Sequence, residues 1–203
     1  YYGADQFGYT ITDNNGGSDS ASVFVTVTGV NDDPSANDDS ATVLEDSSDN
    51  QIDVLGNDLD IDGDDLDITG VSDPPHGTAT FNVDFVFYTP DVNYSGSDSF
   101  SYTISDGNGG SDSAIVSVTV TPVNDPPVAN NDVATVAEDS TNNQINVLAN
   151  DYDIDGDDLD VSGVSDPSHG TASYTIDFVF YTPDPDYTGS DSFTYSISDG
   201  NGG

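Results

Sequence analysis

Apolar and polar residues alternate in short runs along much of this chain. Phe100, Tyr102 and Ile104 alternate with Ser and Thr, and the valines of residues 113–121 alternate in the same way. A period of two directs one face of a β-strand to a core and the other to water. Turn residues interrupt the runs about every 8 to 12 residues. The pattern predicts an all-β protein with almost no helix.

Seven such runs follow one another in the middle of the chain. They cover residues 41–44, 51–55, 66–72, 77–82, 85–89, 98–105 and 113–121. Between the last two runs, the sequence DGNGG predicts a hairpin turn, because Asn and Gly tolerate the positive φ that such turns require. Seven short strands with this spacing are typical of a β-sandwich.

The sequence repeats itself with a period of 93 residues. Phe7, Phe100 and Phe193 begin FGYTITDNNGG, FSYTISDGNGG and FTYSISDGNGG, and residues 31–110 match residues 124–203 at 58 of 80 positions without a gap. We therefore predict three parts. Residues 1–30 are the C-terminal strands of a preceding repeat, residues 31–123 are a complete repeat, and residues 124–203 are a repeat truncated before its last strand.

The sequence begins partway through one repeat and stops before the last strand of another, and this offset has two interpretations. In the simpler one, the sequence is a segment of a much longer array. In the other, strands are exchanged between copies, because residues 18–30 are the part that the last repeat lacks and a neighbouring copy could donate them.

Composition excludes several classes of function. The chain has 39 acidic residues, no Lys and no Arg, and its formal charge is -39. Nucleic acids and anionic membranes would be repelled, and ordinary salt bridges cannot form. The chain also has no Cys, so disulfides cannot stabilise it. We expect neither a nucleic-acid partner nor insertion into a membrane.

Two acidic decapeptides recur at the same phase of the repeat. Residues 58–67 read DLDIDGDDLD and residues 151–160 read DYDIDGDDLD, with six acids in each. Asp at every second position before a Gly is how a loop wraps oxygen ligands around Ca²⁺. The candidate ligands are Asp58, Asp60, Asp62 and Asp64 in the first loop and Asp151, Asp153, Asp155 and Asp157 in the second. Thr69 at the twelfth position and the absence of predicted flanking helices exclude an EF-hand.

Because Ca²⁺ takes six to eight oxygen ligands, other segments must contribute to each site. The candidates are Asn31, Asp32, Asn124 and Asp125 in the sequences that join repeats, and Glu45 and Glu138 after the first strand of each repeat. Lack of Cys and of clustered His disfavours zinc. The alternative interpretation is that these are solvated loops adapted to high salt.

Several motifs together resemble the cadherin-like bacterial Ig repeats that occur in tandem in large secreted adhesins and surface proteins. The motifs are NDDSATVLEDS, VLGNDLDIDGDDLDITGV, PPHGTATF, FVFYTPDVNYSGSDSFSYTISDGNGG and VSVTVTPVNDPP. The resemblance implies tandem seven-stranded Greek-key sandwiches of the Ig-like or cadherin-like kind, stiffened by Ca²⁺ and located outside the cell. It also implies that Asp125, with Asp151, Asp153 and the preceding repeat's Glu45, shares an ion at the junction.

Other conspicuous residues are better explained by structure than by catalysis. His76 recurs as His169 after a Pro-containing turn, and Tyr94 recurs as Tyr187 where Ig-like sandwiches anchor a corner with a Tyr hydroxyl. Near-identical repeats offer no single cleft with a unique acid, base or nucleophile, so we do not expect an enzyme.

The leading hypothesis is a calcium-rigidified structural repeat that extends a surface adhesin or an extracellular filament. Its partners would be neighbouring repeats of the same chain and other copies in a fibre. One alternative is an Ig-like module that binds a polysaccharide or a protein surface. Another is a halophilic surface-layer type of protein whose acids serve solvation only.

Overall fold

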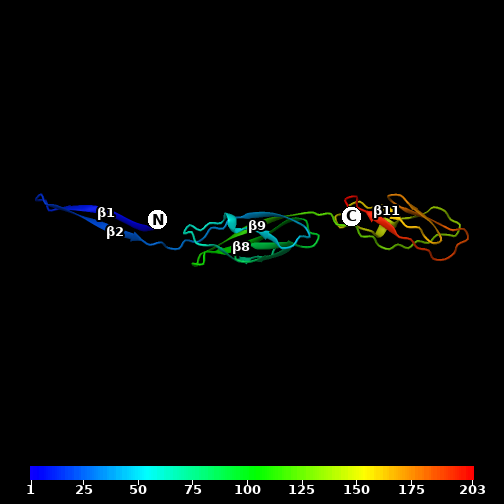
Figure 1. The fold of residues 1–203 in the computed structure, drawn as a ribbon, viewed down its shortest axis with the longest axis horizontal. Coiled ribbons are helices and arrows are strands. Elements are labelled where there is room, and N and C mark those ends of the chain that lie inside the picture. The colour runs from blue at the N-terminus through cyan, green and yellow to red at the C-terminus, as the bar shows by residue number, and fades with distance from the viewer. The chain divides into compact units, whose positions relative to one another are not determined.

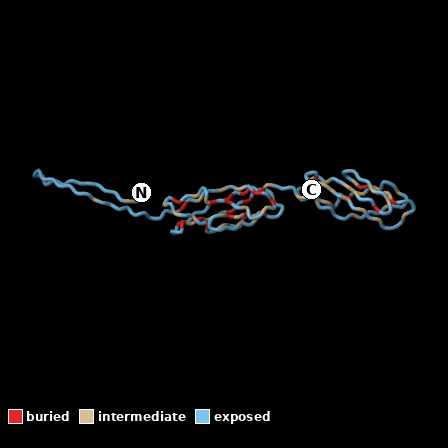
Figure 2. The backbone as a smooth tube through the Cα atoms, in the orientation of Figure 1, coloured by how far each residue is buried: buried red, intermediate tan, exposed pale blue.

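The computed structural model describes residues 1–203, which form two compact units, residues 1–121 and 122–203. The chain begins with an antiparallel hairpin of β1 (Gly3–Thr12) and β2 (Ser18–Val27) (Figure 1). Nearly all of its residues are exposed, on both faces (Figure 2). The alternation in these strands therefore produces a regular ladder without a core.

The first repeat is a β-sandwich of seven strands. They are β3 (Asp39–Leu44), β4 (Asn50–Ile52), β5 (Asp67–Val71), β6 (Gly77–Phe81), β7 (Val86–Pro90), β8 (Gly96–Ser105) and β9 (Ser111–Thr121). One sheet has the order β3-β9-β8-β5 and the other has the order β4-β7-β6. The predicted all-β sandwich is confirmed, and each predicted strand is present with slightly shifted ends. The expected strand at residues 51–55 ends early because a single 3₁₀ turn, η1 (Leu55–Asn57), follows it.

Strand β9 lies at the centre of the larger sheet. It pairs parallel with β3, from Asp39↔Val116 to Leu44↔Thr121, and antiparallel with β8 along ten residue pairs. Its inward residues, Ala114, Val116, Val118 and Val120, are all buried. Branched Val side chains suit a pleated surface that is buried on one face.

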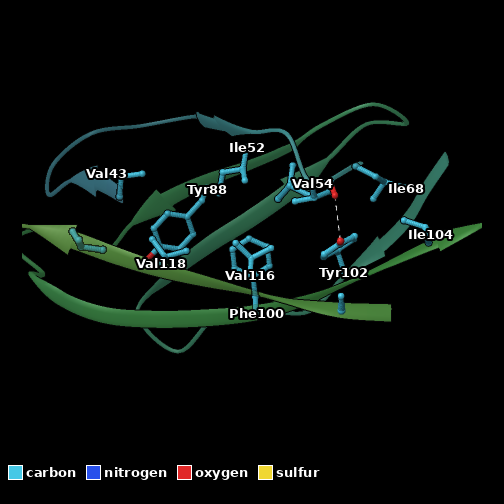
Figure 3. Close-up of a cluster of buried hydrophobic side chains, with 13 residues drawn as sticks. Val43, Ile52, Val54, Ile68, Tyr88, Phe100, Tyr102, Ile104, Val116 and Val118 are labelled. Atoms are coloured by element: carbon cyan, nitrogen blue, oxygen red, sulfur yellow. Dashed lines mark hydrogen bonds between the residues drawn. The ribbon is translucent and has the colours of Figure 1, made fainter. Parts of the chain in front are cut away.

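The core of the first repeat lies between the two sheets, where Tyr88, Phe100 and Val116 come together (Figure 3). The rings of Tyr88 and Phe100 are stacked with 6.0 Å between their centroids. Burying a side chain of this size contributes about 1.5–3 kcal/mol to folding. Tyr102 is also fully buried, and its hydroxyl lies 3.2 Å from the carbonyl oxygen of Val54, the contact dashed in Figure 3.

The second repeat has the same plan but only five strands. They are β10 (Asn143–Ile145), β11 (Asp160–Val164), β12 (Gly170–Tyr174), β13 (Val179–Pro183) and β14 (Tyr195–Ser198), with the 3₁₀ turn η2 (Val147–Asn150) after β10. The sheets have the orders β10-β13-β12 and β11-β14. No residue of this unit occupies the position of β9. Its buried hydrophobic cluster consists of Val147, Val161 and Val179.

The sequence predicts that this repeat lacks its last strand. The repeat also lacks its first strand. Residues 132–137 are equivalent to β3, yet they form no strand. In the first repeat, β3 lies at the edge of its sheet and pairs with β9 alone. Without a counterpart of β9, the backbone groups of residues 132–137 have no ladder partner, and the strand is lost. The chain contains no helix long and apolar enough to cross a membrane.

Candidate metal centre

The first acidic loop is organised around Asp60. Its Oδ1 accepts hydrogen bonds from the backbone N–H groups of Asp62 at 2.8 Å, Gly63 at 3.0 Å and Asp64 at 3.3 Å. Gly63 has a φ of 83°, a conformation that favours glycine and turns the chain back around the Asp60 carboxylate. The alternation of Asp and Gly in the sequence therefore produces a tight loop that surrounds one oxygen of Asp60.

Three carboxylates of this loop come together. Asp60, Asp62 and Asp64 each provide an oxygen that lies within 4.8 Å of the others. Asp60 is only 7% exposed, and its Oδ2 is buried with no hydrogen-bond partner. Burying a carboxylate oxygen without a partner is costly, and the chain has no Lys or Arg to compensate it. A bound cation would provide the missing partner.

The segment before β3, at the start of the first repeat, is tied to this loop. The backbone N–H of Asp32 donates to Oδ2 of Asp62 at 2.8 Å. The side-chain amide of Asn31 donates to Oδ2 of Asp106 at 2.7 Å. Both predicted linker residues thus lie near the acidic loop, Asp32 in direct contact with it and Asn31 through the turn between β8 and β9.

The turn between β8 and β9 completes the surroundings of the loop. The side-chain amide of Asn108 donates to Oδ2 of Asp64 at 2.8 Å. Asp106 is buried, and its Oδ1 accepts the N–H groups of Asn108 and Gly110. The hydrogen bond from Asn31 is the main reason that the pKa of Asp106 is lowered. Asp106 and Asn108 are not among the predicted ligands, although DGNGG recurs at a fixed distance from the acidic loop and is a signal that could have indicated them.

The second acidic loop has the same three-carboxylate arrangement. Asp153, Asp155 and Asp157 each provide an oxygen within 4.8 Å of the others. Oδ2 of Asp153 is buried without a hydrogen-bond partner, and its Oδ1 accepts the N–H of Asp155 at 2.8 Å. The backbone N–H of Asp125 donates to Oδ2 of Asp155 at 2.8 Å. The loop therefore keeps its geometry in a repeat whose core is much smaller.

The turn after β14 also repeats the contacts of its counterpart. Asn124 donates to Oδ2 of Asp199 at 2.7 Å, and Asn201 donates to Oδ2 of Asp157 at 2.8 Å. The hydrogen bond from Asn124 is the largest influence on Asp199 and lowers its pKa to about 2. Both turns thus hold an ionised Asp beside the acidic loop of their own repeat.

Asp58 and Asp151, which the sequence groups with the other candidate ligands, lie apart from the three-carboxylate clusters. Oδ1 of Asp58 accepts the N–H of Asn37 at 2.7 Å, and both of its oxygens lie 3.0–3.1 Å from the Tyr102 hydroxyl. Burial raises the pKa of Asp58. Asp151 is held in the same way by the N–H of Asn130 and the hydroxyl of Tyr195. These two carboxylates connect the start of each loop to its own core.

The two Glu residues have different surroundings. Glu45 is 4% exposed and follows β3, and its backbone N–H donates to the carbonyl oxygen of Thr121 at the end of β9. Glu138 is exposed and follows residues 132–137, which form no strand. The equivalent Glu residues of the two repeats therefore differ in burial.

His76 and Tyr94 form part of the structure, as predicted. Their rings are stacked with 4.2 Å between centroids, and the Tyr94 hydroxyl donates to the carbonyl oxygen of Ser97 at 2.7 Å. His169 and Tyr187 are stacked in the same way, with 4.3 Å between centroids.

Comparisons with known proteins agree with this architecture. The family described as bacterial Ig domain matches residues 31–119 and 124–203. The chain is also similar to Protein GAMETE EXPRESSED 2 of Arabidopsis thaliana, with 41% identity over 76 residues, which are 37% of this chain and 8% of that protein.

Solved structures of similar fold include two sets of cadherin domains. The extracellular cadherin domains 1–5 of Protocadherin Gamma B2 match 96% of this chain with a TM-score of 0.52 and 14% identity. The cis-dimer structure of Protocadherin gammaB7 EC3-6 matches with the same coverage, TM-score and identity. The chain spans 44% and 57% of those two chains. At this identity the likeness concerns the fold.

Proposed function

Because the chain belongs to the bacterial Ig domain family, we propose that it is a non-enzymatic extracellular structural repeat that Ca²⁺ makes rigid. It extends a surface adhesin or an extracellular filament, and its partners are neighbouring repeats and other copies in a fibre. One observation carries the proposal. In both repeats, three Asp carboxylates converge around a buried oxygen, Oδ2 of Asp60 or Asp153, that has no hydrogen-bond partner.

The proposed ion is Ca²⁺ because the donor set contains only oxygen. Carboxylates and carbonyls in a loop with several spare ligands suit the large, irregular coordination shell of Ca²⁺ better than the strict octahedron of Mg²⁺. Asp60, Asp62 and Asp64 would hold the ion in the first repeat, and Asp153, Asp155 and Asp157 would hold it in the second. Asn31, Asp32, Asn124, Asp125, Glu45 and Glu138 are proposed to complete the oxygen ligands, and Asp58 and Asp151 to position the loops.

Rigidity follows from the contacts around the loop. The N–H of Asp32 is bonded to the carboxylate of Asp62, and Asn108 is bonded to Asp64. An ion that holds these two carboxylates also fixes the segment before β3 and the turn after β8. Without the ion, three carboxylates repel one another within one loop, and this repulsion favours opening of all three segments.

The alternatives are less well supported. A polysaccharide-binding module needs several exposed aromatic residues gathered at one surface. Phe81 and its counterpart Tyr174 are exposed, but Tyr88, Phe100 and Tyr102 are buried and Tyr94 is stacked on His76. Acids that serve solvation only would be spread evenly over the surface. In this chain, 12 of the 39 acids lie in the two decapeptides, six in each.

A calcium titration at high ionic strength after chelation tests the proposal. Thermal melting and small-angle scattering are followed together, and high salt removes general charge screening as an explanation. We expect Ca²⁺ to raise the melting temperature and to stiffen the particle, with a much smaller effect of Mg²⁺. The double substitution Asp60→Asn and Asp153→Asn should abolish the response while keeping the acceptor oxygen on which the loop depends.

The matched control is the double substitution Asp84→Asn and Asp177→Asn. It removes the same charge from exposed positions outside the loops and should respond to Ca²⁺ like the unmodified chain. If neither observable responds in the unmodified chain, the decapeptides are solvated loops and the proposal is wrong.

A further inference from the structure

An Asn-Gly pair stands in the turn between β8 and β9. It consists of residues 108–109, and the pair recurs at the same phase of the repeat as residues 15–16 and 201–202. An Asn side chain deamidates most readily when Gly follows it, because the backbone nitrogen of Gly approaches the side chain without a Cβ in the way. The turn of each repeat therefore contains a side-chain amide that is chemically labile.

The reaction at such a pair needs two groups to meet. The backbone nitrogen of the Gly attacks Cγ of the Asn, a nitrogen–carbon bond forms, and the bond from Cγ to Nδ2 breaks. The proton of the backbone nitrogen passes through solvent to the departing nitrogen, so that ammonia leaves and a cyclic succinimide remains. Water then opens the ring and gives Asp or isoAsp. Water is the only co-reactant, and no oxidation or reduction takes place.

Packing does not prevent this reaction in the first repeat. Asn108 is exposed, so water reaches its side chain. Gly109 has a φ of 113°, and no atom beyond its chain neighbours lies within 4 Å of the place that a Cβ would occupy. Hydrogen bonds, rather than steric contacts, therefore control the reacting groups.

Each reacting group is held by a different carboxylate. The side-chain amide of Asn108, which contains the leaving nitrogen, donates to Oδ2 of Asp64 in the acidic loop at 2.8 Å. The attacking N–H of Gly109 is hydrogen-bonded to the buried carboxylate of Asp106. Oδ1 of Asp106 also accepts the N–H groups of Asn108 at 2.8 Å and Gly110 at 2.9 Å. The turn is thus fixed from the inside by Asp106 and from the acidic loop by Asp64.

The second repeat holds its Asn-Gly pair in the same way. The side-chain amide of Asn201 donates to Oδ2 of Asp157 at 2.8 Å, and the N–H of Gly202 donates to Oδ1 of Asp199 at 3.2 Å. In both repeats the amide partner is the third carboxylate of the three-carboxylate cluster. The restraint therefore belongs to the contact between turn and acidic loop.

We propose that Asn108 and Asn201 are deamidation sites that the acidic loop of their own repeat protects, so that the turn is modified when the loop opens. The product has a negative charge in place of an amide donor, and this charge faces Asp64 or Asp157. Because like charges repel, the loop no longer closes as before. A transient opening thus becomes permanent. The inference goes beyond the proposed function, and the protection itself does not require a metal.

Deamidation rates at neutral pH and high ionic strength, in the presence of Ca²⁺, test the inference. The folded chain is digested with chymotrypsin, because it has no Lys or Arg for trypsin, and mass spectrometry follows each Asn separately. The reference is a synthetic peptide of residues 104–112, which contains the turn without the acidic loop. We expect Asn108 to react at least about tenfold more slowly in the chain, since a hydrogen bond to a carboxylate corresponds to such a factor.

Substitutions in the two loops separate the protection of one turn from that of the other. Asp64→Ala should raise the rate at Asn108 about tenfold and leave the rate at Asn201 unchanged, because only the first contact is lost. Asp157→Ala should do the reverse. Asp65→Ala removes the same charge from the neighbouring exposed position and should change neither rate.

A second variant at the same position distinguishes loss of the contact from loss of folding. Asp64→Asn removes the charge but keeps an oxygen that accepts from Asn108, so Asn108 should stay protected. The consequence of the modification is tested by Asn108→Asp, which should lower the melting temperature of the first repeat further than Asn108→Ala does. Both substitutions remove the amide donor, and only the first adds the charge.

A chelator distinguishes this inference from the proposed function. Faster deamidation of the chain after chelation supports both, because loss of the ion opens the loop. Slow deamidation both with and without Ca²⁺ supports the protection by hydrogen bonds and counts against a calcium site. Equal rates at Asn108 in the chain and in the peptide, or equal rates in the Asp64→Ala and Asp65→Ala chains, would overturn the inference.

Discussion

The two repeats share most of their sequence but bury it differently. Phe100 and Tyr102 are almost completely buried, whereas Phe193 and Tyr195 at the same positions of the second repeat are half-buried. The difference is β9, which packs its valines against these rings in the first repeat. The acidic loops, in contrast, are nearly the same in both repeats. The size of the core therefore depends on one central strand, whereas the acidic loops depend on hydrogen bonds that both repeats retain.

The largest expected effect comes from supplying the absent strand to the second repeat. Adding the sequence of residues 111–121 after Gly203 should raise the free energy of unfolding of this repeat by several kcal/mol, because each buried Val contributes about 1.5 kcal/mol or more. Differential scanning calorimetry should show the less stable of two transitions moving toward the other. A transition that does not move would show that β9 is not what distinguishes the repeats.

A smaller effect should follow when β9 is weakened in the first repeat. Val116 is completely buried, so Val116→Ala should cost about 2 kcal/mol of stability. Val23→Ala, the same change in the hairpin, should alter the stability of the first repeat by less than about 0.5 kcal/mol. Urea unfolding of the two variants measures the difference, and equal losses would contradict the account of the core.

A contact between a Tyr hydroxyl and an Asp of the acidic decapeptide is present in both repeats, and removing the hydroxyl tests its contribution to stability. The hydroxyl of Tyr102 lies near Asp58, and that of Tyr195 lies near Asp151. Tyr102→Phe and Tyr195→Phe should therefore each cost about 1–2 kcal/mol in their own repeat. A cost in the first repeat alone, measured by thermal melting, would indicate that the contact depends on the complete core.

The smallest expected effect concerns acid stability and Asp112 in β9 of the first repeat. The N–H of Ala36 donates to Oδ2 of Asp112 at 2.9 Å, and this hydrogen bond lowers the pKa of the carboxyl below its ordinary value of 3.8. The stabilisation from this hydrogen bond is present at pH values above the pKa of Asp112 in the unfolded chain. It is lost as the pH falls through the pKa of Asp112 in the folded chain.

Asp112→Asn should consequently reduce the fall in melting temperature of the first repeat between about pH 6 and about pH 3. The control is Asp19→Asn at the equivalent position of the hairpin, which should leave this fall unchanged. An unchanged profile for the Asp112 variant would show that the hydrogen bond from Ala36 contributes no pH-dependent stability.

Much of the fold could be predicted because alternation with a period of two is a local signal. The seven strands of the first repeat and the position of the acidic loops came from neighbouring residues alone. The loss of the strand at residues 132–137 could not be predicted in this way, since its only partner lies far along the sequence. A strand at the edge of a sheet depends on a neighbour that its own sequence does not reveal.

The candidate metal centre was predictable to a similar extent. The spacing of Asp indicated the loop but not which carboxylates meet, because Asp58 is drawn away by Tyr102, a residue 44 positions later. Asn108 lies 44 residues after Asp64 in the sequence and reaches it only in the folded repeat, as Asn201 reaches Asp157 in the second repeat. Contacts between distant segments therefore select the cluster from a longer series of equivalent acids.

Direct measurement of bound Ca²⁺ by equilibrium dialysis at high ionic strength tests the central claim, that both repeats carry the same cation site although their cores differ. Asp60→Asn and Asp153→Asn should each remove a similar share of the saturable binding, and together they should remove the binding that the two loops provide. If the double variant binds as much Ca²⁺ as the unmodified chain, the acidic loops are not the sites, and the account of a calcium-stiffened repeat is contradicted.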